Sequence, residues 1–113
     1  LWQTQNAHHL LITSGLLDQQ TPASTADALA MAALVPQIEP IANDLWRHEL
    51  ESLPPQSGRL VSNASYPNHR VTAAYRQSRG GDHFVIFNST PIRRTVLRFF
   101  TSCAAGEPVV SGR

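Results

Sequence analysis

The sequence of 113 residues has no lysine, a single cysteine and little charge of either sign. All nine basic residues are arginine and the formal net charge is +1, so the basic excess typical of nucleic-acid-binding modules is absent. The single cysteine, Cys103, excludes an internal disulfide and a cysteine-based zinc site. No apolar run approaches the roughly 18 residues that a membrane-spanning helix needs, so we expect no transmembrane segment in this chain.

The remaining composition is that of a folded protein, with 42% hydrophobic residues. This excludes a disordered chain, and the length allows one domain at most. The chain begins at Leu1 rather than Met, and a buried-strand pattern starts within about ten residues. We therefore expect residues 1–113 to be part of a longer polypeptide.

Two apolar segments predict strands of a parallel sheet. His8–Thr13 ends in a Ser-Gly turn, and Val71–Tyr75 lies much later in the chain. Continuous apolarity is typical of strands that are covered on both faces. Between them, Ser24 with Asp27 three positions later predicts the start of a helix. This order of strand, loop and helix indicates an α/β fold.

The best-defined predicted helix lies near the end of the chain. Thr90 is expected to cap it, Pro91 occupies its first position, and Gly106 ends it. One apolar stripe recurs at helical spacing on Ile92, Val96, Phe99, Phe100 and Cys103. The preceding apolar run, Phe84–Phe87, is interpreted as core.

Residues 35–70 are the least regular part, because prolines interrupt them repeatedly. We interpret this segment as an insertion or excursion. Within it, Val35–Ile41 is compatible with a short strand, and Asn43-Asp44 with the cap of a helix that extends to Leu53. Trp46 is interpreted as a packing residue, with the lining of an acyl pocket as the alternative.

Asp18 and His83 are the candidate catalytic residues. Each follows one of the two predicted strands, and functional groups of open parallel sheets gather in loops at the carboxyl ends of strands. An aspartate that accepts the Nδ1–H of a histidine fixes the tautomer of the ring and stabilises the imidazolium. We therefore expect an acid–base pair.

These segments resemble parts of the α/β-hydrolase family. Leu10–Asp18 followed by Thr21-Pro22 resembles the segment that bears the acid of the catalytic triad. Gly80-Gly81-Asp82-His83-Phe84 resembles the C-terminal histidine loop, and the helix after it resembles the final helix of that fold. The resemblance covers residues 8–34 and 71–106, leaving out the middle of the chain.

The resemblance implies that Asp18 is the triad acid and His83 the general base. The family order is nucleophile, acid, histidine, so the serine and the oxyanion hole would lie upstream. No serine in this chain stands in a G-x-S-x-G elbow. A complete α/β-hydrolase sheet with its helices also needs far more than these residues. We therefore expect residues 1–113 to be the C-terminal portion of one such domain, dependent on the N-terminal portion of the same polypeptide.

Other residues offer weaker alternatives. Asp44 is a reserve candidate for the triad acid, whereas Asp82 is adjacent to His83 and is better interpreted as stabilising its loop. Adjacent residues of a strand point to opposite faces, so His8 and His9 are poor joint metal ligands. We expect neither a metal nor a cofactor.

The function that the resemblance implies is hydrolysis of carboxylic esters by a serine hydrolase of the esterase or lipase type. The expected substrate is a small-molecule or lipid-like ester, and nucleic acid is not an expected partner. The rival hypothesis is a stand-alone α/β binding module without catalysis. The sequence leaves the cellular compartment open.

Overall fold

The computed structural model describes residues 8–66 and 69–112, which form a mixed α/β structure. Its elements are, in chain order, β1 (Leu10–Gly15), α1 (Ala23–Ala33), α2 (Trp46–Leu50), β2 (Arg59–Leu60), β3 (Ala64–Tyr66), β4 (His69–Val71), β5 (Ala73–Ser78), α3 (Val85–Asn88), α4 (Thr90–Ala104) and β6 (Val110–Ser111). None of the helices in the described ranges is long and apolar enough to cross a membrane.

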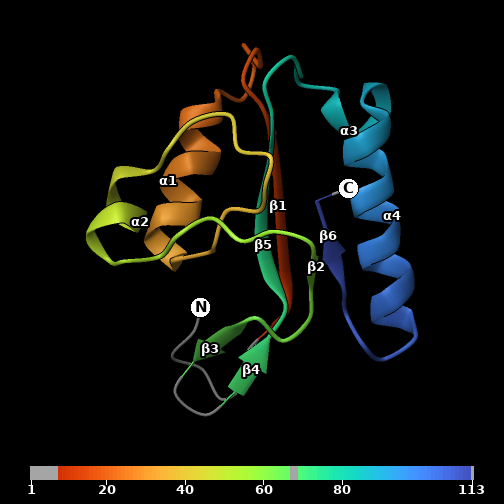
Figure 1. The fold of residues 1–113 in the computed structure, drawn as a ribbon. Coiled ribbons are helices and arrows are strands. Elements are labelled where there is room, and N and C mark those ends of the chain that lie inside the picture. The colour runs from red at the N-terminus through yellow and green to blue at the C-terminus, as the bar shows by residue number, and fades with distance from the viewer. Residues whose placement is uncertain (1–7, 67–68, 113) are drawn as a thin grey trace.

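Strands β1 and β5 form the centre of the fold. They pair in parallel, with Leu10 opposite Ala73 and Gly15 opposite Ser78. Helix α1 covers one face of this pair and α4 covers the other (Figure 1). Cover on both faces explains why the strands contain so many apolar residues. The two predicted parallel strands are therefore confirmed, although each lies a few residues later than its apolar run suggested.

Strand β5 extends further than expected because polar residues continue it. Arg76 and Gln77 are buried, although such residues usually lie in loops or on surfaces. The side-chain oxygen of Gln77 accepts a hydrogen bond from the backbone N–H of Ala42 at 2.9 Å. Hydrogen bonds of this kind offset the cost of burying a polar group, so the strand can contain buried polar residues.

Helix α1 begins differently from the prediction. It starts at Ala23 directly after Pro22, and no side chain caps its first turn. The expected pairing of Ser24 with Asp27 at the helix start is wrong, because Asp27 instead accepts a hydrogen bond from the Tyr75 hydroxyl at 2.6 Å. The long-range bond competes with the local cap and holds the helix against β5.

Helix α4 is confirmed, with two corrections. Ser89, not Thr90, is the capping residue, and its side chain accepts a hydrogen bond from the N–H of Ile92 at 3.5 Å. The buried face contains Ile92, Thr95 and Phe99. Phe100, which the apolar stripe placed on that face, is exposed. A stripe this wide exceeds the strip of helix that β1 and β6 cover.

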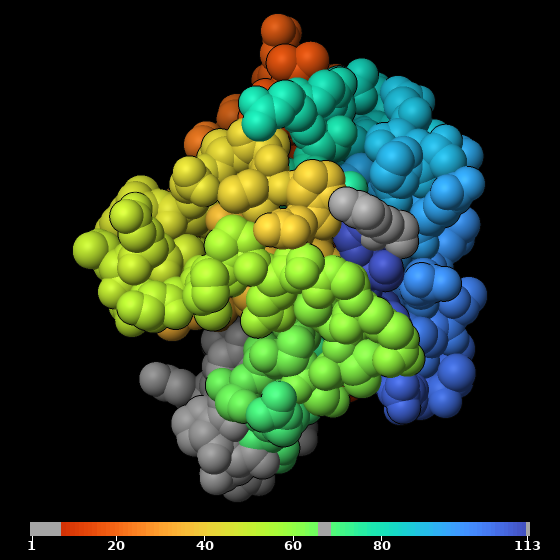
Figure 2. Space-filling view, in the orientation of Figure 1, coloured from red at the N-terminus to blue at the C-terminus, as the bar shows by residue number. Residues whose placement is uncertain are grey.

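The segment 35–70 is attached to the sheet rather than separate from it. Gln37 forms a parallel bridge with Tyr75, and Ile38 forms another with Gln56. The short strand expected at Val35–Ile41 is thus reduced to isolated bridges. The bridge of Gln37 lies along the edge of β5 that faces away from β1. In Figure 2 this yellow-to-green part of the chain covers the front of the molecule.

Helix α2 is shorter than predicted. It ends at Leu50 instead of Leu53, and its preceding residue Leu45 is extended and offers no capping side chain. Trp46 is 65% exposed, so its interpretation as a packing residue is wrong. The helix lies on the α1 side of the sheet (Figure 1).

The core has two parts, one on each face of the sheet. The first packs α1 against β1 and β5, and its buried members are Ile12, Ala30, Ala33, Val35, Leu45, Val71, Ala73 and Tyr75. The second packs α4 and β6 against the other face, with Ile38, Leu60, Ala74, Phe99 and Val110 buried. Ala30 and Ala33 of α1 are buried in the first part, and their small side chains let the helix pack closely on the strands.

The run Phe84–Phe87 is not core, contrary to expectation. Only Val85 is buried, whereas Phe84 is 51% and Phe87 is 70% exposed. The run spans the short helix α3, and a helix of one turn can direct only one or two of its residues toward the sheet. Its aromatic side chains therefore lie on the surface beside His83.

Candidate active site

Asp18 and His83 are in contact in the folded chain. The Nδ1 atom of His83 lies 3.1 Å from Oδ2 of Asp18. Asp18 follows the carboxyl end of β1, and His83 follows that of the adjacent strand β5. The parallel pairing carries both loops to the same edge of the sheet, which is why residues so distant in sequence meet.

The backbone of its own loop holds the carboxylate of Asp18 in place. Its Oδ1 atom accepts hydrogen bonds from the backbone N–H groups of Gln20 and Thr21, each at 2.8 Å. Oδ1 thereby fixes the turn, and Oδ2 is directed at His83. Aspartate is well suited to this turn because its short side chain reaches N–H groups two and three residues ahead.

The same contacts affect the protonation of Asp18. Desolvation raises the pKa of the carboxyl, but the hydrogen bonds from Thr21, Gln20 and His83 outweigh it, so the pKa lies below its ordinary value. A carboxyl that accepts several hydrogen bonds is favoured in its ionised form. Asp18 is therefore a carboxylate at neutral pH, and its Oδ2 can accept a hydrogen bond from an Nδ1–H group of His83.

A close approach of two glycines locks the two loops together. The N–H of Leu17 donates to the carbonyl of Gly81 at 2.8 Å, and that of Leu16 donates to Ser78 at 3.0 Å. A Cβ atom at Gly15 would overlap the backbone of Gly81, and one at Gly81 would overlap Val85. Only residues without a side chain allow this separation, so the glycines help to set the distance between Asp18 and His83.

The second nitrogen of His83 is free for chemistry. With Asp18 ionised, Nδ1 carries the proton and Nε2 keeps a lone pair. No described residue hydrogen-bonds to Nε2. The His83 side chain is 38% exposed, whereas that of Asp18 is 11% exposed. The imidazole is thus the more exposed member of the pair, and the carboxylate lies beneath it.

Neither alternative acid contacts His83 within the described ranges. Asp82 accepts a hydrogen bond from the N–H of Phe84 at 2.8 Å, which confirms its interpretation as a residue that stabilises the loop. Asp44 is exposed and lies just before α2, on the other side of the sheet from α3. The geometry selects Asp18.

An aromatic ring packs against His83. The Phe84 ring packs edge-on against the imidazole, with ring centroids 5.2 Å apart and planes at 86°. Leu17, next to Asp18 in the sequence, and Phe87 in α3 are also exposed large hydrophobic residues.

Sequence reasoning missed a buried polar network behind the sheet. The Tyr75 hydroxyl donates to Asp27 at 2.6 Å, so the Ser14 hydroxyl, 2.6 Å from it, must donate to Tyr75. Burial, reinforced by the bond to Asp27, raises the pKa of Tyr75 to about 12. The signal available in sequence was a tyrosine within an apolar strand, whose hydroxyl needs a partner when buried.

The two ends of the network extend to residues of the middle segment. The Gln77 side chain donates to the Asn43 side chain at 2.6 Å and to Asp27 at 3.3 Å. The Gln37 side chain donates to Gln77 at 3.1 Å. These contacts fasten residues 37–43 to α1 and β5, and they explain why the irregular segment has a defined position.

Comparisons of the chain with protein-family models, curated proteins and solved structures find no significant match.

Proposed function

We propose that this chain is the C-terminal portion of an α/β-hydrolase that cleaves carboxylic esters, with Asp18 as triad acid and His83 as general base. The observation that carries the proposal is the contact of Nδ1 of His83 with Oδ2 of Asp18 at 3.1 Å. This is the contact that a triad requires between its acid and its base. The free Nε2 nitrogen is the atom that would receive the proton of a nucleophile.

The open edge of the sheet supports a missing upstream portion. Within the described residues, β1 has β5 as its only strand partner. The other edge of a parallel strand carries N–H and C=O groups that need partners, and parallel sheets are rarely so narrow. A strand from the N-terminal portion, leading to the nucleophilic serine, would satisfy this edge.

In the proposed reaction, the serine Oγ attacks the ester carbonyl carbon while its proton passes to Nε2 of His83. Asp18 stabilises the imidazolium through Nδ1–H. The tetrahedral intermediate then collapses, and His83 returns the proton to the departing alkoxide. Water gives a proton to Nε2 and attacks the acyl-enzyme, after which the acid product leaves and serine regains its proton. This sequence needs no metal or cofactor.

The exposed hydrophobic residues of the two loops and of α3 favour an ester with an apolar, lipid-like part. Leu17, Phe84 and Phe87 provide this surface. Burial of apolar area contributes about 25 cal/mol per Å², so even one acyl chain lying on these side chains would contribute to binding. The polar carbonyl end of the ester would then lie at His83.

The test is active-site labelling by a fluorophosphonate in the natural polypeptide that includes this chain and its upstream sequence. We expect labelling of a serine, loss of labelling in His83→Ala, and normal labelling in His69→Ala, which removes an exposed histidine on β4. Absence of labelling in every variant would favour the non-catalytic binding module. Labelling that persists in His83→Ala would remove the base from the proposal.

A further inference from the structure

Arg76 is a buried cation without an anionic partner among the described residues. It is 5% exposed, and no carboxylate of the described residues lies within ion-pair distance of it. One terminal nitrogen donates to the carbonyls of Pro40 at 3.0 Å and Gln77 at 2.9 Å. Its Nε is buried and makes no hydrogen bond. Arginine cannot shed its proton to escape this cost, so a buried guanidinium usually has a charged partner.

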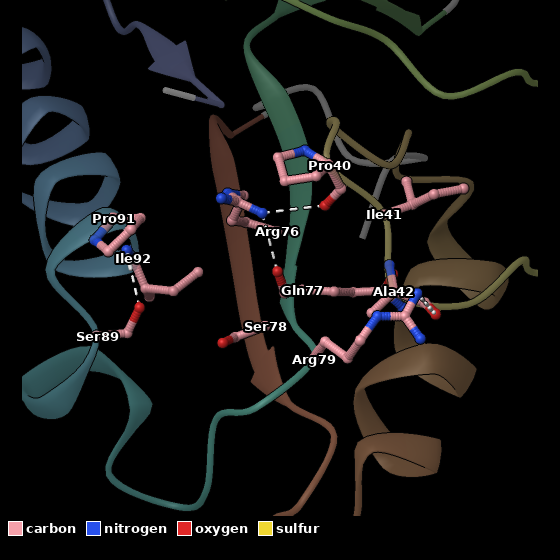
Figure 3. A pocket seen from close by; sticks show the side chains of 10 residues that line it. All are labelled: Pro40, Ile41, Ala42, Arg76, Gln77, Ser78, Arg79, Ser89, Pro91 and Ile92. Carbon is pink, nitrogen blue, oxygen red and sulfur yellow. Dashed lines mark hydrogen bonds between the residues drawn. The ribbon is translucent and has the colours of Figure 1, made fainter.

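Arg76 lines two cavities. One, of about 200 Å³, is lined by Arg76 and Arg79 of the β5 end and by Ser89, Pro91 and Ile92 at the start of α4 (Figure 3). The other, of about 870 Å³, is lined by Arg76, Arg94 and Gly112 among others.

The electrostatics of the smaller cavity favour a negative charge. None of the described residues that line it is acidic, and Glu39, which lines the larger cavity, forms no ion pair with a described arginine. The first turn of α4 adds the positive end of a 15-residue helix. The Ile92 N–H donates to the Ser89 side chain, and Pro91 has no N–H. The helix therefore contributes mainly its dipole, and few free N–H donors.

We propose that Arg76 forms a binding site for a small oxyanion, a carboxylate or a phosphate group, in the cavity between β5 and the start of α4. The first terminal nitrogen of Arg76 donates to two carbonyls and Nε is fully buried, so the second terminal nitrogen is the donor left for an oxygen of such a group. Arg79 lies at the mouth of the cavity and donates to the carbonyl of Ala42 at 3.0 Å, and its remaining donors add to the attraction. A cavity of about 200 Å³ accepts a group of this size but not a large ligand.

The site is independent of the proposed ester hydrolysis. It involves neither Asp18 nor His83, and it lies beside the sheet rather than in the acid–base pair. The loop of His83 borders a third cavity, of about 380 Å³, which Arg76 does not line.

The test is calorimetric titration of the natural full-length polypeptide with inorganic phosphate and, separately, with acetate, at an ionic strength held constant with chloride. We expect saturable binding of one anion per chain, with the two titrations showing which oxyanion the cavity prefers. Arg76→Gln should weaken the binding about tenfold or more, the size of a lost charged hydrogen bond. The matched control, Arg47→Gln, removes an arginine of α2 on the opposite side of the sheet and should leave the affinity unchanged.

Arg79→Gln keeps the test decisive if Arg76→Gln does not fold, because Arg79 is exposed. It should reduce the affinity several-fold in a folded protein. Absence of saturable binding in the wild type overturns the proposal, as does unchanged affinity in a folded Arg76→Gln or Arg79→Gln variant. In those cases Arg76 serves only to bind the two carbonyls.

Discussion

The imidazole of His83 contacts one oxygen of the Asp18 carboxylate, and the other oxygen accepts hydrogen bonds from the backbone of residues 20 and 21. Oδ2 lies 3.1 Å from Nδ1, and Oδ1 accepts the N–H groups of Gln20 and Thr21. The two oxygens thus have separate tasks, one structural and one directed at the histidine. This division lets a substitution remove the second task and keep the first.

Asp18→Asn should abolish most of the ester hydrolysis that we propose while leaving the fold intact. The Asn side-chain oxygen can still accept the N–H groups of Gln20 and Thr21, but its amide donates to Nδ1. The proton then moves to Nε2, which can no longer accept the serine proton. We expect kcat to fall about 10⁴-fold, measured with a p-nitrophenyl ester on the full-length polypeptide.

Asp82→Asn is the matched control for that experiment. It makes the same chemical change one residue before His83, at a carboxylate that binds the Phe84 N–H. An Asn oxygen can accept this bond, so turnover should stay within a few-fold of wild type. Equal losses in both variants, or near-wild-type turnover of Asp18→Asn, would contradict the role of Asp18.

The depressed pKa of Asp18 predicts how stability depends on acid. The carboxyl titrates at a lower pH in the folded chain than at its unfolded value of 3.8. Between these values the unfolded chain binds more protons, so the free energy of unfolding rises with pH. The stabilisation is complete above 3.8 and is lost as pH falls through the folded value.

Urea denaturation of wild type and Asp18→Asn over a series of acidic pH values checks this prediction. The difference in unfolding free energy between the two proteins should narrow as the pH falls below about 4. A difference that stays constant through this range would show that the contacts of Asp18 do not favour its ionised form in the folded chain.

The close approach of the two loops makes Gly15 and Gly81 sensitive to the smallest side chain. Gly15→Ala places a methyl group against the backbone of Gly81, and Gly81→Ala places one against Val85. Backbone shifts that relieve such overlap cost about 1–3 kcal/mol and separate Asp18 from His83. We expect both lower thermal stability and lower turnover.

Gly80→Ala is the control for the glycine series, because a Cβ there meets no atom within 4 Å. It should leave stability and turnover near those of wild type. If Gly80→Ala were as damaging as Gly81→Ala, flexibility of the loop rather than the space between the loops would explain the loss.

The parts of the fold that follow from continuous apolar runs and their order were predictable from sequence. Parallel pairing of two such strands implied that the loops of Asp18 and His83 meet, and the structure brings these residues into contact. Their catalytic roles remain a prediction. The existence of helix α4 was also predictable, since its proline and apolar spacing are local signals, although its cap is Ser89 rather than Thr90 and Phe100 is exposed.

The features that sequence reasoning missed depend on partners far along the chain. Asp27 fits a local helix-start pattern, yet Tyr75 from β5 captures its carboxylate. Arg76 resembles a loop residue by type, but carbonyls of other segments allow its burial. Phe84–Phe87 reads as core by composition, and only the position of α3 shows which side chains face the solvent.

The hydroxyl of Tyr75 is expected to be the most important single polar atom for the stability of the sheet. Tyr75→Phe leaves Ser14 without its acceptor and deprives Asp27 of its shortest bond. Unsatisfied buried groups of this kind cost about 1–3 kcal/mol, and urea denaturation at neutral pH measures the loss.

A double-mutant cycle with Ser14→Ala should show coupling of about 0.5–3 kcal/mol, whereas strict additivity would mean that the Ser14–Tyr75 bond contributes nothing.

The same tyrosine makes a prediction for alkaline pH. Its pKa is raised from 10.0 in the unfolded chain to about 12 in the folded one, so between these values the folded chain binds more protons. The free energy of unfolding of wild type should therefore fall as pH rises through this window, and the advantage over Tyr75→Phe should shrink with it. A parallel decline of both proteins from pH 10.0 to about 12 would show that burial and the bond to Asp27 do not raise the pKa of Tyr75 in the folded chain.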